Sequence, residues 1–369
     1  MAYSDTARTP EQIADLVAST QELIVSKGAL TNLMTDLTQY IGLEQLYRKH
    51  QKVFGGGMDW RFDVITDHNH SARHVQLYGA DTDNHVDATI KGVVGPRFSD
   101  ANYVYDVREE VLNRGSAVQI YDFIKTKVAQ MKMSAYELIE QDIWGAPATA
   151  DDKLTPYGLK FWITRQSDTD KAVDGHANGG FDGKDPKLAT SATVATPIAV
   201  ARAGISSASV SRWANWAARY AGITKEDLVK KMRYAALKTD FRSPISMSEP
   251  TVGSGRGIYT NSDVLMELES ILEAQNMNLG NDIASKDGKC TFKSRAITHA
   301  PYLDDDPGDP IYFLDWSSLA IGMLAGWGEH MSKPIMVPNK HNVYRVFMDG
   351  GWNMVCTNLR KQAVISKTA

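Results

Sequence analysis

The chain has 369 residues, enough to bury a sizeable core in one to three domains, and its composition is ordinary, with 43% hydrophobic and 23% charged residues. Its formal net charge of -4 at pH 7 excludes a general polyanion-binding protein, because the chain lacks the positive field that attracts phosphates. No apolar run reaches the roughly eighteen residues of a membrane-spanning helix, and the polar N-terminus resembles neither a signal peptide nor a basic presequence.

Two helices are predicted in the first fifty residues. Thr9 and Pro10 begin a helix over residues 10–26, and a second helical pattern covers residues 30–50. Six acids (Asp5, Glu11, Asp15, Glu22, Asp36 and Glu44) stand against four fixed cations (Arg8, Lys27, Arg48 and Lys49), so the net charge of this segment is -2. Such a segment is not expected to bind nucleic acid tightly.

A long β-hairpin or meander is predicted over residues 54–110. Apolar and polar residues alternate in three short runs, residues 60–64, 74–78 and 88–94, and this period of two is typical of strands with one wet face. An isolated hairpin is marginal in water, so this one must lean on the rest of its own chain or on a neighbouring copy. Residues 103–107 predict a strand that returns towards the next helix.

One long helix is predicted over residues 116–145, and it is the longest regular element of the chain. Ser116 and Gln119 form a capping box at its start, while Gly145 and Pro147 end it. Apolar residues recur at steps of three and four, which favours one buried stripe along the helix. The residues expected to form the core of this spine are Ile120, Ile124, Val128, Met131 and Leu138.

The pattern becomes less regular towards and beyond the end of the spine. Ser134 and Glu137 form a second capping box, which predicts a break or kink of the helix near Met133. Residues 156–163 then predict a strand. Residues 164–211, rich in Asp, Gly, Ala, Ser and Thr, form a long segment of the kind that is usually functional or interfacial.

Helices and strands mix in the C-terminal half. Thr224 and Asp227 cap a helix that ends near Lys238, and Asn261 or Ser262 begins the next one, over residues 264–275. Strands are expected around Phe292 and Ile297 and over residues 311–314, 334–337, 342–348 and 352–356. The last two flank Asp349, Gly350 and Gly351, which form a hairpin signal. The whole order predicts an α+β fold with antiparallel strands from both ends of the chain.

Three patterns could in principle hold a ligand, but each favours a solvated turn or loop. The acidic run 304–309 offers carboxylates for Ca²⁺ without the spacing of an EF-hand, and the glycines of residues 253–257 lack the Lys-Ser/Thr of a phosphate-binding loop. His68, His70 and His74 could be metal ligands, but no matching Cys or acid pattern accompanies them.

No catalytic constellation is recognisable in the sequence, so no catalytic, cofactor-binding or metal site is predicted and the chain is not expected to be an enzyme. There is no nucleophile elbow of the G-x-S-x-G kind. Cys290 and Cys356 lie far apart, which favours buried free thiols in a reducing compartment over a disulfide or a metal knuckle.

The order of arm, hairpin, long helix, central segment and closing strands resembles the major capsid proteins of tailed bacteriophages, which have the Hong Kong 97-like fold. The resemblance covers essentially the whole chain. It rests on local signals at residues 105–109 (YDVRE), 137–145 (ELIEQDIWG), 178–181 (NGGF), 273–282 (EAQNMNLGND) and 301–304 (PYLD). None of these is a catalytic motif.

By this resemblance, residues 1–53 would be an N-terminal arm, and residues 54–115 an extended loop with its return strand. Residues 116–154 and 336–369 would form a peripheral domain, and residues 155–335 an axial domain with an insertion-like segment at 164–211. Contacts between subunits are expected at Asp63, Asp67, His68, His70, Arg73, Asp81, Asp83 and Arg97.

The implied function is a structural shell. Copies of the chain would assemble into hexamers and pentamers of an icosahedral capsid in the host bacterial cytoplasm and end up in the virion. Scaffold and portal proteins, and in some phages decoration proteins, would be the partners. The shell would enclose double-stranded DNA with weak, non-specific contact, and neither a cofactor nor a membrane is implied. Two alternatives stay open from sequence: an encapsulin-type compartment that encloses protein cargo, and a metal-dependent two-domain hydrolase.

Overall fold

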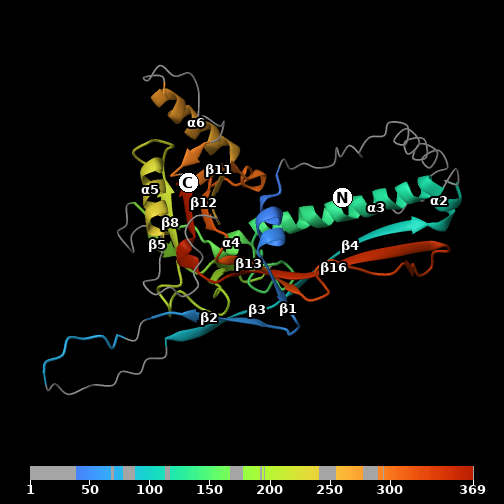
Figure 1. Ribbon diagram of the computed structural model, residues 1–369, viewed down its shortest axis with the longest axis horizontal. Coiled ribbons are helices and arrows are strands. Elements are labelled where there is room, and N and C mark those ends of the chain that lie inside the picture. Colours follow the sequence, from blue (N-terminus) through green and yellow to red (C-terminus); the bar gives the residue numbers. More distant parts are fainter. Residues whose placement is uncertain are drawn as a thin grey trace. The chain divides into compact units, whose positions relative to one another are not determined.

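The computed structural model describes residues 39–67, 70–77, 88–112, 117–166, 178–191, 193–194, 196–240, 255–276, 290–293 and 295–368. By its internal contacts the chain divides into two compact units. Unit 1 takes its described residues from Phe98–Ile139 and Gly326–Gly351. Unit 2 takes them from Gln39–Arg97, Glu140–Ala325 and Trp352–Ala369. Helix α3 (Ala117–Trp144) and strand β16 (Val343–Cys356) contribute residues to both units (Figure 1).

A mixed seven-stranded sheet forms the centre of unit 2, in the order β10-β11-β9-β12-β17-β8-β5. Helices α5 (Leu228–Lys238) and α6 (Ser262–Asn276) pack on it, because Leu228 and Val264 join one apolar cluster with Phe313 of the sheet. Alternation is absent from the strands at residues 215–220 and 311–315, because nearly every side chain there is buried. The strands are β5 (Gly180–Gly183), β8 (Asn215–Tyr220), β9 (Arg256–Thr260), β10 (Thr291–Phe292), β11 (Arg295–His299), β12 (Ile311–Asp315) and β17 (Ala363–Lys367).

Three further groups of elements belong to unit 2. Strand β13 (Leu319–Leu324) pairs in parallel with β1 (Gln51–Phe54) and antiparallel with residues 352–356 of β16. Two separate two-stranded sheets are formed by β2 (Trp60–Ile65) with β3 (Thr89–Val94), and by β6 (Lys187–Ala189) with β7 (Pro197–Ala199). The remaining described helical segments are the π-helix Leu43–Lys49, the four-residue α4 (Leu159–Trp162) and the 3-10 turns Pro301–Leu303 and Leu359–Lys361.

Unit 1 consists of the larger part of α3 and a small set of strands, together with the short helix α2 (Val107–Leu112). Strand β4 (Arg97–Asp106), β14 (His330–Met331) and β15 (Ile335–Met336) all pair with β16. Lys127 of α3 fastens the helix to this layer, since its ammonium lies 2.7 Å from Glu109 and donates to the Val104 carbonyl oxygen at 3.1 Å.

Most elements predicted from the sequence are confirmed. Helix α3 covers the expected stretch, α5 and α6 begin and end close to the expected residues, and Asn261 caps α6 by accepting the Val264 N–H at 3.1 Å. The first and last runs of the predicted hairpin pair as β2 and β3. The predicted helix 10–26 and residues 30–38 of the predicted helix 30–50 lie outside the described residues, whereas residues 41–49 of the latter are helical.

Four local predictions are wrong. Residues 343–356 form one continuous strand and no hairpin, because Met348 and Asp349 pair with β14 and the Gly351 N–H donates to the Trp327 carbonyl oxygen. The ladder therefore runs across the glycines. Residues 159–162 are helical, since consecutive buried side chains face neighbours on several sides. Residues 74–77 form no strand, and α3 continues through Ser134 without a break.

Candidate assembly surfaces

The β2–β3 ribbon has one apolar and one polar face. Its six antiparallel pairs begin at Trp60 with Val94 and end at Ile65 with Thr89, and every second pair points to the same side. The apolar side carries Trp60 opposite Val94, Phe62 opposite Gly92 and Val64 opposite Ile90. Gly92 is needed there, because a Cβ at that position would lie 2.5 Å from the Phe62 ring.

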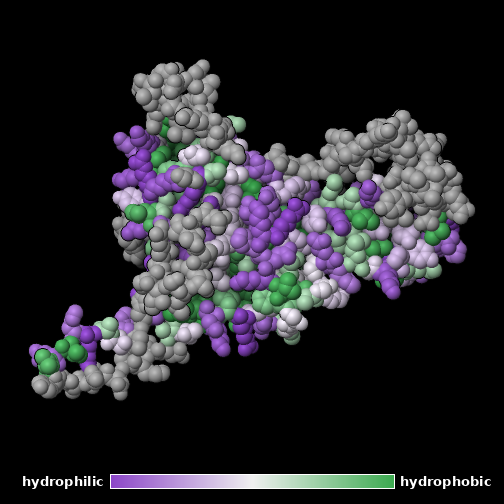
Figure 2. All heavy atoms as spheres, viewed as in Figure 1, coloured by the Kyte–Doolittle hydropathy of each residue, from purple (hydrophilic) through white to green (hydrophobic). Residues whose placement is uncertain are grey.

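Burial falls along the ribbon from its base towards its far end. At the base, Trp60 is 2% exposed, stacks on Phe54 with ring centroids 4.7 Å apart and covers Gly322 of β13. At the far end Val64 is partly buried and Ile90 is 37% exposed on the same face, while Ile65, on the other face, is 65% exposed. Hydrophobic residues stay exposed among polar ones beyond β2, where Val75 is 63% and Leu77 is 89% exposed (Figure 2). The isolated chain therefore leaves apolar surface in water along this ribbon.

The predicted interface residues on the ribbon are polar and accessible. Asp63 and Arg73 are exposed, and Asp67 contacts His70 at 3.1 Å and Arg212 at 3.7 Å. His68, Asp81 and Asp83 lie outside the described residues. Arg97 lies at the other end of the ribbon, where its guanidinium donates to the Lys153 carbonyl oxygen and stands 5.4 Å from the Tyr157 ring centroid. The structure therefore spreads the described members of this set over both ends of the ribbon.

The spine residues differ in their surroundings. Met131 is buried and Val128 is partly buried, whereas the side chains of Ile120 and Ile124 lie outside the described part. Leu138 is 41% exposed, so its assignment to the core is wrong for the single chain. Ile143 and other residues of the last turns bury the opposite side of α3, because successive residues advance by about 100° around a helix.

A buried carboxylate that the sequence did not single out caps the helical segment after residue 40. Glu140 is 1% exposed and accepts the N–H groups of Gly42 (2.9 Å) and Leu43 (2.6 Å) and the indole N–H of Trp144 (2.8 Å). Burial raises the pKa of Glu140, and these hydrogen bonds offset part of that rise. Gly42 leaves the necessary room, since a Cβ there would lie 2.7 Å from Ile143.

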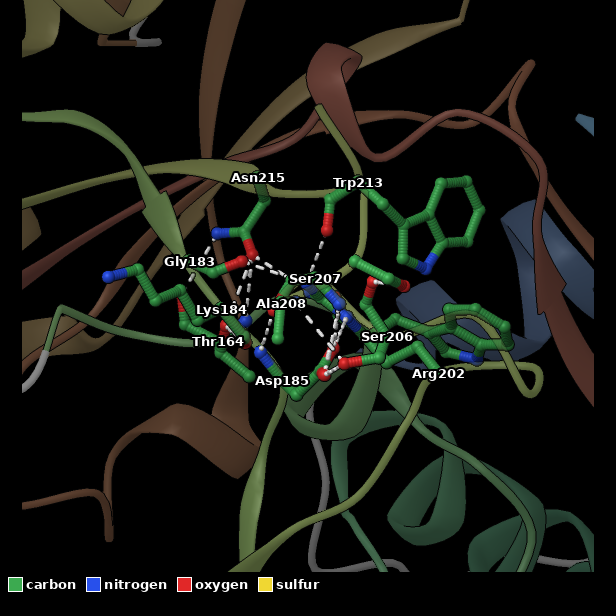
Figure 3. A network of polar contacts seen from close by, with 12 residues as sticks. Thr164, Gly183, Lys184, Asp185, Arg202, Ser206, Ser207, Ala208, Trp213 and Asn215 are labelled. Atoms are coloured by element: carbon green, nitrogen blue, oxygen red, sulfur yellow. Dashed lines mark hydrogen bonds and ion pairs between the residues drawn. The ribbon is translucent and has the colours of Figure 1, made fainter. Parts of the chain in front are cut away.

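Arg202 is the centre of a buried polar network, and no sequence motif singled it out. It is 0% exposed. It donates to the carbonyl oxygens of Trp162 (2.8 Å), Gly183 (2.8 Å) and Trp213 (3.0 Å) and to the Asn215 side chain (3.2 Å), as Figure 3 shows. Burial lowers the pKa of Arg202 to about 10, which keeps it charged at neutral pH. A cation among apolar and small neighbours at residues 198–205 is the only signal that could have pointed to it.

A cavity of about 950 Å³ lies beside this network in unit 2. Its wall includes four cations, Lys160, Arg165, Lys184 and Lys187, and four acids, Asp182, Asp185, Asp305 and Asp306. Asp306 binds Arg165 through both oxygens and Lys160 at 3.1 Å. Burial alone would raise the pKa of Asp306, but the Arg165 hydrogen bonds and charge hold it well below the usual range. The ionic groups thus neutralise one another, which gives the cavity no marked preference for a charged ligand.

The acidic run 304–309 is used for structure. Asp304 lies 2.8 Å from His299 and accepts the Ser262 N–H at the start of α6. Asp309 binds Lys367 at 2.9 Å and accepts the Asn261 amide. Among the described residues, no group of three or more His, Cys, Asp or Glu side chains could hold a metal ion.

The two cysteines are free and buried, as the sequence predicted. Burial raises the pKa of the Cys290 thiol and raises that of Cys356 to about 12, so neither is a reactive thiolate at neutral pH. Of the described helices, none combines the length and the apolar character needed to span a membrane.

Known structures resemble the chain in fold. It aligns with the subunit of a cyanophage A-1(L) capsid at a TM-score of 0.57 and 12% identity, covering 93% of this chain and 97% of that one. It aligns with the capsid of a native GTA particle at a TM-score of 0.50 and 11% identity, covering 94% and 99%. No protein-family model matches the sequence, and no characterised protein matches it by sequence.

These alignments extend over nearly the whole of each chain, so the shared arrangement is that of the entire subunit. The chain therefore has the fold of phage capsid subunits, the Hong Kong 97-like fold that the sequence predicted. At this level of identity the likeness establishes the fold alone.

Proposed function

We propose that the protein is a major capsid protein, a structural subunit that assembles with copies of itself into a closed shell. The observation that carries this proposal is the β2–β3 ribbon and the segment beyond β2, which expose apolar residues, Ile65 and Ile90 in the ribbon and Leu77 past it. Covering apolar surface stabilises by about 25 cal/mol per Å². A neighbouring copy that covers the ribbon supplies this stabilisation, and the capsid fold of the chain supports such a neighbour.

The finer proposal is an icosahedral bacteriophage capsid built from hexamers and pentamers. Rings of subunits arise from head-to-tail contacts that close by rotation, and many modest contacts then add up to a stable shell. Assembly in the host cytoplasm, with scaffold and portal proteins and in some phages a decoration protein, belongs to the same proposal. The role is structural, and Asp63, Asp67, His70 and Arg73 are proposed contacts between subunits.

Double-stranded DNA is the proposed content of the shell, held with weak and non-specific contact. The formal net charge of -4 supports this part, because tight DNA binding needs clustered cations that neutralise phosphates. Fluorescence anisotropy of the purified subunit with duplex DNA at about 0.15 M salt tests it. We expect no measurable binding below micromolar concentration; sub-micromolar affinity with a steep salt dependence would contradict the proposal.

Sedimentation and electron microscopy of the purified protein test the shell itself. We expect rings and closed particles, with or without an added scaffold protein. A compact monomer under every assembly condition, with scaffold supplied, would contradict the proposal. Particles from the native source that contain protein cargo and no DNA would instead support an encapsulin-type compartment.

A further inference from the structure

The segment after strand β7 runs alongside the β2–β3 ribbon and contacts it at two places. The Val93 N–H donates to the Ala203 carbonyl oxygen at 2.9 Å, at the second pair of the ribbon from its base. Arg212 lies 3.7 Å from Asp67, two residues past the last pair. From Arg61, the partner of Val93, to Asp67 the strand advances by roughly 20 Å at 3.3 Å per residue.

A ribbon held at one end can still change its direction, whereas further contacts along its length fix that direction. Trp60 and Phe54 hold the ribbon at its base, where Asn353 also donates to the Gly95 carbonyl oxygen at 2.7 Å. Farther out along the ribbon, the described residues make the contacts Val93–Ala203 and Asp67–Arg212. The direction of the ribbon thus depends on where the segment that carries Ala203 and Arg212 is held.

Ala203 is presented to the ribbon by a tight turn. The Ile205 N–H donates to the Arg202 carbonyl oxygen at 3.0 Å, and the two central residues both have positive φ, 54° at Ala203 and 76° at Gly204. Positive φ at both central positions is the geometry of a type I′ turn. Glycine adopts this backbone readily, whereas a β-branched residue does not.

The turn is fixed to the body by the first of its residues. The guanidinium of Arg202 binds three carbonyl oxygens and the Asn215 side chain, all inside unit 2. Asp185 lies 3.8 Å from Arg202 and also accepts the Ser206 hydroxyl (2.8 Å) and the Ser207 N–H (3.0 Å). Both ends of the turn are therefore tied to the strand β5 region (Figure 3).

We infer that the turn Arg202 to Ile205, held in place by the Arg202 network, is the contact that fixes the direction in which the β2–β3 ribbon leaves the body of the subunit. Arg202 is then a positioning residue, which acts on the ribbon through Ala203. If the proposed shell function holds, this direction also determines the angle at which the ribbon meets a neighbouring copy. In this way the segment 182–213 takes part in setting the curvature of the shell.

The test measures the distance between ribbon and body in the unassembled full-length subunit. Spin labels on Lys91→Cys in β3 and Lys230→Cys in α5, both exposed sites, give a distance distribution by pulsed electron double resonance. Labelling is selective because Cys290 and Cys356 are buried. Gly204→Val disturbs the turn through its φ of 76° alone, since a Cβ there meets nothing within 4 Å.

Two control variants distinguish the effect of the turn on ribbon direction from general effects of substitution. Gly222→Val makes the same chemical change at a glycine without positive φ, where the nearest heavy atom to a Cβ is 3.9 Å away. Ala203→Gly keeps the turn, because glycine favours its φ of 54°. We expect both controls to keep the wild-type distribution, and Gly204→Val to shift or broaden it.

Arg212→Ser removes the outer contact on the surface and covers the case in which Gly204→Val does not fold; we expect it to broaden the distribution to a smaller extent. An unchanged distribution in folded Gly204→Val, or in Arg212→Ser if the former does not fold, would overturn the inference. Because the distances are measured without assembly, they stand whether or not particles form. The diameters of particles assembled from Gly204→Val then test the curvature step: a wider spread supports it, and the wild-type diameter contradicts it.

Discussion

The seven-stranded sheet and the β2–β3 ribbon belong to the same unit but differ in how much of their apolar surface the single chain buries. In the sheet, Ile311, Phe313 and Ile365 are at most 2% exposed, and α5 and α6 add to the same cluster. In the ribbon only the base is covered, and Ile65 keeps 65% of its surface in water. The buried sheet stabilises the fold of the single chain, whereas the exposed apolar residues of the ribbon contribute little until another surface covers them. On the proposed function, the sheet is therefore the part that holds the subunit folded, and the ribbon is the part that contacts a neighbouring copy.

Removing the ribbon is the most drastic way to break this comparison. If residues 63–90 are replaced by a short Gly/Ser linker, we expect particle formation to be lost while the sheet of unit 2 still folds. The reason is that the ribbon beyond its base adds little to the core. Circular dichroism and particle yield measure the two effects separately. Loss of the native spectrum together with the particles would show that the ribbon also holds the fold together.

A pair of matched truncations sharpens the comparison residue by residue. Ile311→Ala in the sheet leaves a cavity at a fully buried site and should lower the free energy of unfolding by about 2–5 kcal/mol. Ile65→Ala removes the same atoms from an exposed site of the ribbon and should change it by at most about 0.5 kcal/mol. Urea denaturation of the unassembled subunit gives both values. Equal losses in the two variants would contradict the division of roles.

A smaller effect is expected at the C-terminal end of α3, where the partly buried carboxyl group of Asp142 lies near Asp152. Burial, reinforced by Asp152, raises the pKa of Asp142 to about 6. A carboxyl group with a raised folded pKa holds its proton more tightly in the folded chain, so stability falls as pH rises between about 4 and 6. Asp142→Asn removes this loss. Its melting temperature relative to wild type should therefore be higher at pH 8 than at pH 4, and no pH dependence of the difference would contradict the assignment.

Periodicity in the sequence was enough to predict the parts whose burial repeats regularly. The apolar steps of three and four located α3, α5 and α6, and the alternation at residues 60–64 and 88–94 located the two strands of the ribbon. Local turn chemistry was less reliable. Asp349, Gly350 and Gly351 resemble a hairpin turn, yet pairing with β14 keeps them extended inside β16.

Single buried polar residues escaped the sequence analysis because nothing local marks them. Glu140 lies on a helix that carries other charged residues, and only the structure brings it to the N–H groups of Gly42 and Leu43, ninety-eight and ninety-seven positions away. Arg202 likewise depends on three main-chain carbonyl oxygens and the Asn215 side chain, which come from three separate segments. Leu138 shows the converse error, since a position in the apolar stripe is not covered within one chain. Long-range contacts decide these cases, and no periodicity encodes them.

Hydrogen exchange of the subunit before and after assembly tests the central claim most directly, because it reports on sheet and ribbon in one experiment. Backbone amides of β12 and β17 should exchange slowly in both states, since the sheet is complete in the single chain. Amides of β2 and β3 beyond the base should exchange fast in the free subunit and slowly in particles, where a neighbouring copy covers the ribbon. Equal exchange of the ribbon amides in the two states would contradict the account.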